Sequence, residues 1–230
     1  MFSGKLLQLA PNGAWVAGIG RDAQGPQPLS ISVGNCRSKR LIRLAERVWR
    51  TERLSGVPQN TVTPDPASVK RIAEESALIV AARSLASARQ DWAGGFSWPA
   101  RGRISGVYGS QRILNGKPSS PHLGLDIAAL RGTPVYASAA GRVTLHHQDM
   151  LLTGKTVLLD HGHGVSTIYL HLDQIDVVDG QELKSGQKLG AIGTTGRSTG
   201  PHLHFQLHWF QEKLDPALVL PAVQREPNGD

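Results

Sequence analysis

Two short stretches organise this chain: PHLGLD at residues 121–126 and GPHLH at residues 200–204. The first contains a His-x-x-x-Asp pattern, the second is a His-x-His pattern, and YLHL at residues 169–172 lies between them. Together they offer four histidines and one carboxylate, the ligand types that hold zinc in catalytic sites. The three stretches therefore predict a zinc centre, together with further histidines that are not needed as ligands and can transfer protons.

The spacing within each stretch indicates how the side chains are presented. His202 and His204 lie two residues apart in an apparent strand, so their side chains point to the same face, roughly 6.5–7 Å apart. His122 and Asp126 are four residues apart, but Gly124 favours an extended, bent path over a helix. A catalytic zinc keeps three protein ligands and one position for water, whose pKa it lowers towards neutrality. Spacing alone leaves open which histidines are ligands.

The segment from residue 96 onward predicts an antiparallel β-sheet or sandwich. Short β-rich runs alternate with Gly-rich turns, and connections this short cannot carry helical crossovers. The expected strands span residues 103–107, 124–127, 135–138, 141–147, 156–160, 165–170, 188–192 and 201–209. His171 then ends a strand where the sheet gives way to a groove.

The residues before the main domain predict a small β-rich region at 1–60 and a connector with a helix at 61–95. Residues 29–34 alternate polar and apolar side chains, the period of a half-buried strand. For residues 38–54 the spacing of apolar side chains slightly favours a helix over a strand. A polar tail at 217–230 follows the main domain, which spans residues 96–216.

One helix is expected in the connector. Asp65 is suited to cap it, with Pro66 at the first helical position, where a missing N–H costs nothing. We expect about 24 residues of helix, ending at Gly94-Gly95. Its inner face is predicted to comprise Val69, Ile72, Ala73, Ser76, Ile79, Val80 and Arg83.

The bulk composition narrows the choice of partners and location. A net charge of +7 and a pI of about 9.9 suit an anionic partner, but no basic run or known module indicates nucleic acid. Cys36 is the single cysteine, so an internal disulfide is excluded. We expect Cys36 to be a small core residue. No window approaches 18 apolar residues, so no membrane span is expected. The first residues show no signal-peptide pattern.

Several separated motifs resemble, in the same order, the lysostaphin/LytM-type zinc endopeptidases that cut bacterial peptidoglycan cross-links. They are GVYG at 106–109 with Arg112, HLGLDIA at 122–128, GTPVYA at 132–137 with Gly141, YLHL at 169–172 and GRSTGPHLHF at 196–205. The resemblance implies the mainly β, duplicated hybrid motif fold of that family for residues 96–216. Residues 1–60 look like a shortened form of the N-terminal β region of some Gram-negative members. Such a region would either cover the groove and inhibit the enzyme, or bind wall polymer or a partner.

The resemblance also implies roles for the five residues. His122, Asp126 and His204 match the zinc ligands, whereas His171 and His202 match the two histidines that flank the scissile bond. Some family members have lost ligands and act as binding modules that activate other wall hydrolases. This chain departs at none of the five positions, which favours an active enzyme.

Several polar residues lie outside the five positions that match metal ligands and catalytic histidines. Tyr108 and Arg112 precede His122 and are expected at the groove rim, where they would hold an oxyanion or a substrate carboxylate; packing and surface charge are the alternative. His208 shares the alternation of His202 and His204, and we interpret it as a sheet-face residue rather than a groove residue. Four histidines have no matching carboxylate and receive no role: His146, His147, His161 and His163.

The predicted function is hydrolysis of peptidoglycan stem-peptide cross-links, of the D-alanyl–diaminopimelate kind, by a zinc endopeptidase in the periplasm or cell envelope. The main alternative is a non-catalytic LytM-like regulator that binds and activates a cell-wall amidase. Two histidines and one carboxylate also suit Fe(II) in an oxygenase, but the flanking motifs favour the peptidase.

Overall fold

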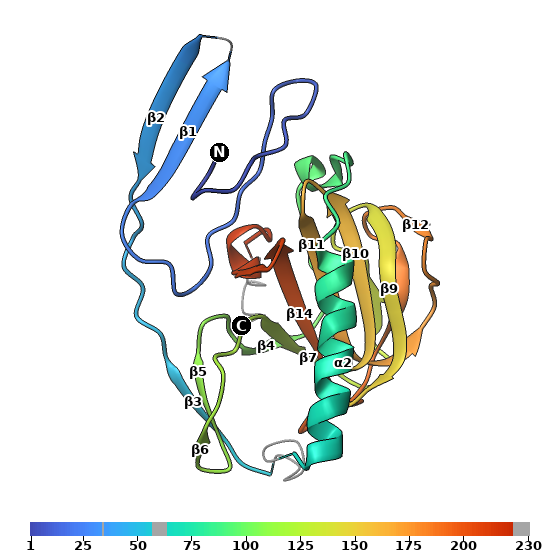
Figure 1. Ribbon diagram of the computed structural model, residues 1–230. Coiled ribbons are helices and arrows are strands. Elements are labelled where there is room, and N and C mark those ends of the chain that lie inside the picture. The colour runs from blue at the N-terminus through green and yellow to red at the C-terminus, as the bar shows by residue number, and fades with distance from the viewer. Residues whose placement is uncertain (34, 57–63, 223–230) are drawn as a thin grey trace, which may run out of the picture.

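A ten-stranded antiparallel sheet dominates the computed structural model, which describes residues 1–33, 35–56 and 64–222 (Figure 1). This mainly β architecture confirms the predicted fold class. The strands of the sheet are β4 (Arg103–Gly106), β7 (Leu125–Ala128), β8 (Pro134–Tyr136), β9 (Gly141–Met150), β10 (Gly154–Gly162), β11 (Val165–Ile175), β12 (Glu182–Leu183), β13 (Lys188–Ile192), β14 (His202–Trp209) and β15 (Glu212–Leu214). Each strand expected after residue 96 is present, although β9 and β11 run further than predicted.

The sheet order explains how distant motifs meet. Its main path runs β12-β9-β10-β11-β14-β7-β4, with β13 beside β11 and β8, and β15 beside β14. Strand β11 pairs with β14 through residues 165–170 and with β13 through residues 172–175. His171 therefore lies where β11 changes partner, in the middle of the strand and not at its end as predicted.

Side chains alternate between the two faces of the central strands. Leu159, Tyr169 and Phe205 belong to the main core on one face, whereas Leu158 and Ile168 pack on the other face beneath the helix. Full burial of a large apolar side chain contributes about 1.5–3 kcal/mol, so the two layers hold the central strands from both sides. This rigid centre supports the strand ends that carry the functional side chains.

The second face is covered by α2 (Pro66–Arg83), which runs along β9 and β10 (Figure 1). Asp65 caps it as predicted, because its carboxylate accepts a hydrogen bond from the Ser68 amide at 2.8 Å. Its length is 18 residues, shorter than predicted. The helix stops at Arg83 because the chain beyond it turns to bind the sheet, where the Ser87 hydroxyl donates to Asp160 on β10.

The inner face of α2 also differs from the prediction. Ile79 and Ala82 pack on the sheet, and Arg83 is buried. Val69 and Val80 are 54% and 43% exposed, although both were expected inside. The 3-10 helix η1 (Asp91–Gly94) follows, and Gly95, with a φ of 78°, ends it.

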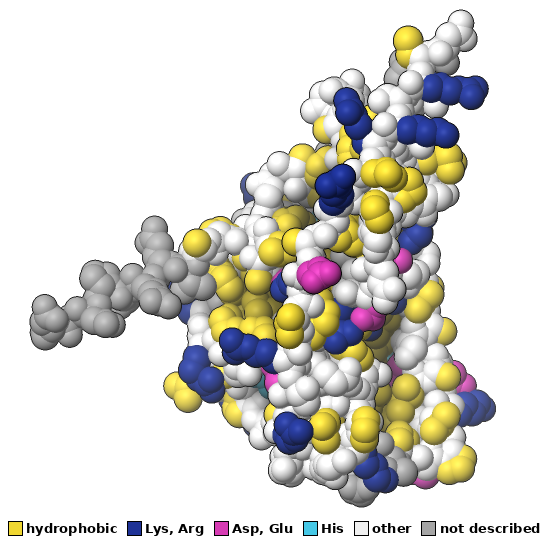
Figure 2. Space-filling view, turned by 90° about the vertical axis from the view of Figure 1, so that its left-hand side faces the viewer, with side chains coloured by type: hydrophobic (Ala, Val, Ile, Leu, Met, Phe, Trp, Pro, Cys, Tyr) yellow, Lys and Arg dark blue, Asp and Glu magenta, His cyan; other side chains and the backbone are white. Residues whose placement is uncertain are grey.

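The N-terminal region forms a projecting hairpin and then an extended strap, which comprises residues 43–54. Strands β1 (Gln27–Val33) and β2 (Cys36–Ile42) pair with each other in a two-stranded sheet, and the first residues of the chain bridge to β1 at Leu29. Exposed Lys and Arg side chains stand out on the hairpin in Figure 2. Leu29 is buried but Ile31 is 43% exposed, so β1 is a strand without the expected half-burial. Cys36 is exposed, which corrects its placement in the core.

The helix that was slightly favoured over residues 38–54 is wrong. Residues up to Ile42 pair with β1, and β3 (Thr51–Leu54) pairs in parallel with β5 (Gln111–Leu114), which also pairs with β6 (Lys117–Pro118). Val48 is 98% exposed, so the helical spacing of apolar residues does not describe a buried face. Strand pairing with distant segments overrode the local pattern.

The expected connector and tail fall partly outside the described residues, which omit 57–63 and 223–230. The described part of the tail begins with η2 (Pro216–Leu218). No helix in the described part of the chain has the length and hydropathy that a membrane span requires.

Candidate metal centre

The structure brings together the three residues predicted to bind zinc. Asp126 on β7 lies directly across from His204 on β14, and His122 approaches from the loop before β7. His122 Nε2 lies 3.0 Å from Asp126 Oδ1 and 2.9 Å from His204 Nδ1. Asp126 Oδ1 and His204 Nδ1 are 2.6 Å apart. All three side chains are buried. Three donor atoms therefore converge on one small volume.

Backbone groups fix how these ligands are presented. His122 Nδ1 lies 2.9 Å from the Val107 carbonyl, which can only accept, so Nδ1 carries the proton and Nε2 offers a lone pair. Gly124 packs against the His204 ring, where a Cβ would lie 2.5 Å from Nε2, and a Cβ on Gly106 would collide with the Asp126 carboxylate. The two glycines are required because the backbone passes so close to the ligands.

The charges of the cluster suit a cation. Burial alone would raise the pKa of Asp126, but His204 and His122 hold it well below its usual range. Burial also lowers the pKa of His204 to about 4. At neutral pH the set is therefore one carboxylate with an unprotonated imidazole beside it. Two imidazole nitrogens and one carboxylate oxygen are a donor set that zinc accepts with about 2.0–2.2 Å bonds, so these residues fit the metal.

His171 and His202 lie beside the metal ligands and line the adjoining cavity. Their ring centroids are 4.8 Å apart, and His202 Nε2 is 3.9 Å from Asp126 Oδ1. His171 Nδ1 donates to the Thr195 carbonyl and His202 Nδ1 to the Gly200 carbonyl, both at 2.8 Å. With the Nδ1 proton bound to a carbonyl, the Nε2 atom of each ring is the one that can accept a proton.

His171 reaches this position through an irregular backbone. Its φ is 62°, the left-handed region that non-glycine residues rarely adopt. Val157 pairs with Tyr169 and Lys155 pairs with Leu172, so β11 holds one residue more than β10 between these pairs. Tyr169 and Leu172 both face the main core. Regular alternation would have placed His171 beside Tyr169 in the core, and the bulge directs it to the cavity instead.

A cavity of about 310 Å³ adjoins the metal cluster. Its polar walls include Arg112 on β5 and Arg197 on the loop between β13 and β14. The N-terminal strap also contributes a wall, through Glu52 and Leu54 of β3. Sequence reasoning missed these two residues because nothing in the local sequence signals the pairing of β3 with β5.

Arg112 is the predicted rim residue that the structure does bring to the site. One of its guanidinium nitrogens, Nη2, lies 2.7 Å from Asp126 Oδ2. That ion pair engages the outer oxygen of the carboxylate, while Oδ1 faces the two histidines. Such an outer contact orients a metal ligand and restricts its motion.

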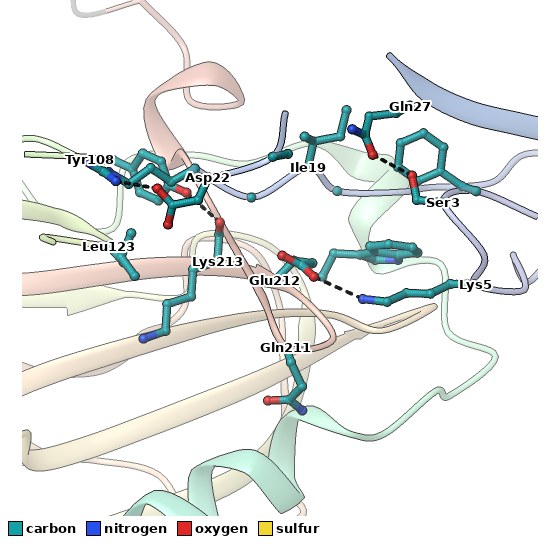
Figure 3. Close-up of a pocket in the computed structure, with 16 residues that line it drawn as sticks. Ser3, Lys5, Ile19, Asp22, Gln27, Tyr108, Leu123, Gln211, Glu212 and Lys213 are labelled. Atoms are coloured by element: carbon teal, nitrogen blue, oxygen red, sulfur yellow. Dashed lines mark hydrogen bonds and ion pairs between the residues drawn. The ribbon is translucent and has the colours of Figure 1, made fainter. Parts of the chain in front are cut away.

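Tyr108, the other predicted rim residue, lies elsewhere. Its hydroxyl donates to the Lys213 carbonyl at 2.7 Å (Figure 3), and its ring packs edge-on against Trp49. Burial raises the pKa of Tyr108 to about 12. Among the described residues that line the 310 Å³ cavity Tyr108 is absent, so it serves packing between the strap and the main domain.

A buried polar chain extends behind His204. Gln206 Nε2 lies 2.7 Å from His204 Nε2, and the other end of that amide lies 2.9 Å from the His208 ring. Arg83 of α2 reaches His208 Nδ1 at 2.9 Å. His208 is thus buried against the helix and not exposed in the groove. Gln206 shares the alternation of His202 and His204, a signal that could have found it, whereas Arg83 carried no such signal.

The four unassigned histidines stay apart from the metal cluster. His161 is completely buried, and its ring nitrogens bond Ala140 O and Thr167 Oγ1. His146 pairs with Asp179 at 2.8 Å, which corrects the expectation that it has no matching carboxylate.

Comparison with known proteins now identifies the family. Residues 120–216 match the model of Peptidase family M23. A solved structure from Pseudomonas aeruginosa, described as a putative peptidase M23, is 31% identical and superposes with a TM-score of 0.70 over 95% of this chain and 85% of that one. The chain belongs to peptidase family M23. The resemblance inferred from the motifs is thereby confirmed.

Two curated relatives of this M23 chain carry informative names. Cell division protein DipM of Caulobacter vibrioides is 35% identical over 166 residues, which are 70% of this chain and 26% of DipM. Peptidoglycan DD-endopeptidase ShyA of Vibrio cholerae is 42% identical over 106 residues, 46% of this chain and 24% of ShyA. The M23 chain thus spans about a quarter of the length of these two relatives.

Proposed function

We propose that this M23 protein is a zinc-dependent endopeptidase that hydrolyses peptide cross-links of bacterial peptidoglycan. The observation that carries the proposal is the convergence of His122 Nε2, Asp126 Oδ1 and His204 Nδ1 beside a cavity lined by His171 and His202. Zinc, when bound, supplies a Lewis acid that polarises the scissile carbonyl and activates water.

The chain's own residues have separable roles in this proposal. His122, Asp126 and His204 hold the metal, and Arg112 restrains the Asp126 carboxylate. His171 and His202 have their Nδ1 protons bound to backbone carbonyls, so each Nε2 is available to accept a proton from water. The protonated ring can then donate a hydrogen bond to the oxygen that becomes negative.

The substrate class rests on the relatives and on charge. ShyA is named as a peptidoglycan DD-endopeptidase, and Mpg of Neisseria meningitidis, 40% identical over 98 residues, as a DD-carboxypeptidase/endopeptidase. The net charge of +7 suits an anionic wall polymer. We therefore propose stem-peptide cross-links as the substrate and the periplasm or cell envelope as the location, with other wall enzymes as partners.

The competing function is a non-catalytic regulator of a cell-wall amidase. All five candidate metal and proton-transfer residues are present; three of them converge on one small volume, and His171 and His202 line the adjoining cavity. A regulator has no need of this arrangement. The complete site favours the enzyme.

The test uses the full chain, purified with measured zinc content, and wall sacculi. We expect cross-linked muropeptides to disappear in mass analysis of the products, and to persist after chelation of the metal. The matched control is His202→Ala, which keeps the three ligands. Cross-links that persist equally with stoichiometric zinc and with chelator would contradict the enzyme and leave the regulator as the better description.

A further inference from the structure

Two arginines share the cavity beside the metal cluster. Arg112 extends from β5 and Arg197 from the loop between β13 and β14, and both line the same 310 Å³ space as His171 and His202. Burial lowers the pKa of Arg197, and the charge of Arg112 lowers it further. Two positively charged side chains therefore line one small cavity beside the metal cluster.

Two carboxylates lie in this wall, and they satisfy Arg112 only in part. Asp126 faces the metal cluster through Oδ1 and Arg112 through Oδ2. Glu52 lies 3.5 Å from Arg112 Nε, too far for a good hydrogen bond. Arg112 Nε is buried and has no hydrogen-bond partner among the described residues. A guanidinium with one unpaired donor, together with a second guanidinium in the same wall, favours an anion in the cavity.

We propose that Arg112 and Arg197 recognise a substrate carboxylate on the carbon that bears the scissile amide nitrogen. This inference rests on the proposed function. Arg112 contacts the proposed ligand Asp126 at 2.7 Å and Arg197 lines the same small cavity, so a carboxylate held between the arginines would lie close to the bond under attack. Guanidinium groups bind carboxylates through paired, charge-assisted hydrogen bonds.

The proposal specifies the cross-link. In a D-alanyl–diaminopimelate cross-link, the carbon attached to the amide nitrogen carries a free carboxylate. A glycine bridge offers no carboxylate there, and an amidated diaminopimelate offers only a neutral amide. The arginine pair would thus select unamidated diaminopimelate cross-links and C-terminal D-alanyl-D-alanine, which bears its carboxylate at the equivalent carbon.

The test compares two synthetic peptides that differ in one group. Both contain the D-alanyl–diaminopimelate amide, one with the free carboxylate beside it and one with a carboxamide. We expect the zinc-loaded protein to prefer the carboxylate peptide in kcat/KM by about tenfold or more. Arg197→Gln should bring this ratio close to one by slowing only the carboxylate peptide. Arg197→Lys, which keeps the charge but loses the paired geometry, should give an intermediate ratio.

Two controls separate recognition from folding. Zinc content should be the same in all variants, because the proposed ligands His122, Asp126 and His204 are unchanged. Glu52→Gln removes the competing carboxylate beside Arg112 and should keep or raise the preference. Equal cleavage of both peptides by the wild-type protein, or equal slowing of both by Arg197→Gln, would overturn the proposal.

A binding measurement keeps this inference distinct from the proposed function. If zinc-loaded protein cleaves neither peptide, the endopeptidase proposal fails. Calorimetry with the same two peptides then decides on the arginine pair: tighter binding of the carboxylate peptide, lost in Arg197→Gln, supports it, and equal binding overturns it.

Discussion

His161 and His204 are buried histidines of one sheet, on β10 and β14, with 0% and 7% exposure. Both ring nitrogens of His161 have ordinary partners, since Nδ1 donates to the Ala140 carbonyl at 2.6 Å and Nε2 accepts from the Thr167 hydroxyl at 2.8 Å. In His204 the Nδ1 atom instead lies among donor atoms of Asp126 and His122.

The difference shows what distinguishes a candidate metal ligand from a structural histidine. Burial lowers the pKa of both residues, so neither burial nor pKa separates them. What separates them is the neighbour of each ring nitrogen: one carbonyl and one hydroxyl complete the needs of His161, whereas the atoms around His204 Nδ1 together favour a cation. The following substitutions probe this comparison.

The largest effect is expected at the proposed metal ligand His204. His204→Ala removes one of the three proposed protein ligands, and we expect zinc affinity to fall by at least about a hundredfold, with loss of cross-link cleavage. Bound zinc after dialysis against a mild chelator is the measurement. Retention of one zinc per chain would show that His204 is not a ligand.

His202→Ala tests the division of labour within the site. The three proposed ligands remain, so zinc content should stay near that of the wild type, while kcat should fall by about 10²–10⁴-fold through loss of a proton-transfer group. Loss of zinc from this variant, with retention by His204→Ala, would reverse the two roles.

His161→Ala tests the structural side of the comparison. It removes the hydrogen bonds of the His161 ring to the Ala140 carbonyl and the Thr167 hydroxyl and opens a cavity, so the free energy of unfolding should fall by about 2–4 kcal/mol. Chemical denaturation measures this, and zinc bound per folded chain should not change. A loss of zinc without a loss of stability would contradict the distinction drawn above.

His146→Ala should have the smallest effect. His146 pairs with Asp179 near the surface, where the side chains are 30% and 58% exposed, so the ion pair contributes less than about 1 kcal/mol. Thermal unfolding should shift little, and zinc content and cleavage should match the wild type. A large change in either would indicate a role that its position does not explain.

Much of the fold was predictable because its signals are local. Alternating β-rich runs separated by glycine turns located the main strands after residue 96 but missed the short strands β5, β6, β12 and β15. Asp65 with Pro66 located the start of α2. The end of α2 was predicted wrongly because no helix-breaking residue ends the helix there. Contacts between the sheet and the residues beyond Arg83 end it instead. The helix favoured at residues 38–54 failed for a related reason, since β3 is held by pairing with β5.

The sequence by itself determined which residues offer metal-binding groups, and the order of its motifs indicated the M23 family. Only the tertiary structure decided that β7 and β14 pair with Asp126 opposite His204, and that a bulge turns His171 out of the core. The tertiary structure also places Tyr108 in a packing contact outside the cavity, and it brings Glu52 and Arg197 together in the cavity wall. Ligand type is a property of each side chain, whereas convergence depends on pairing between strands far apart in the chain, which local pattern does not encode.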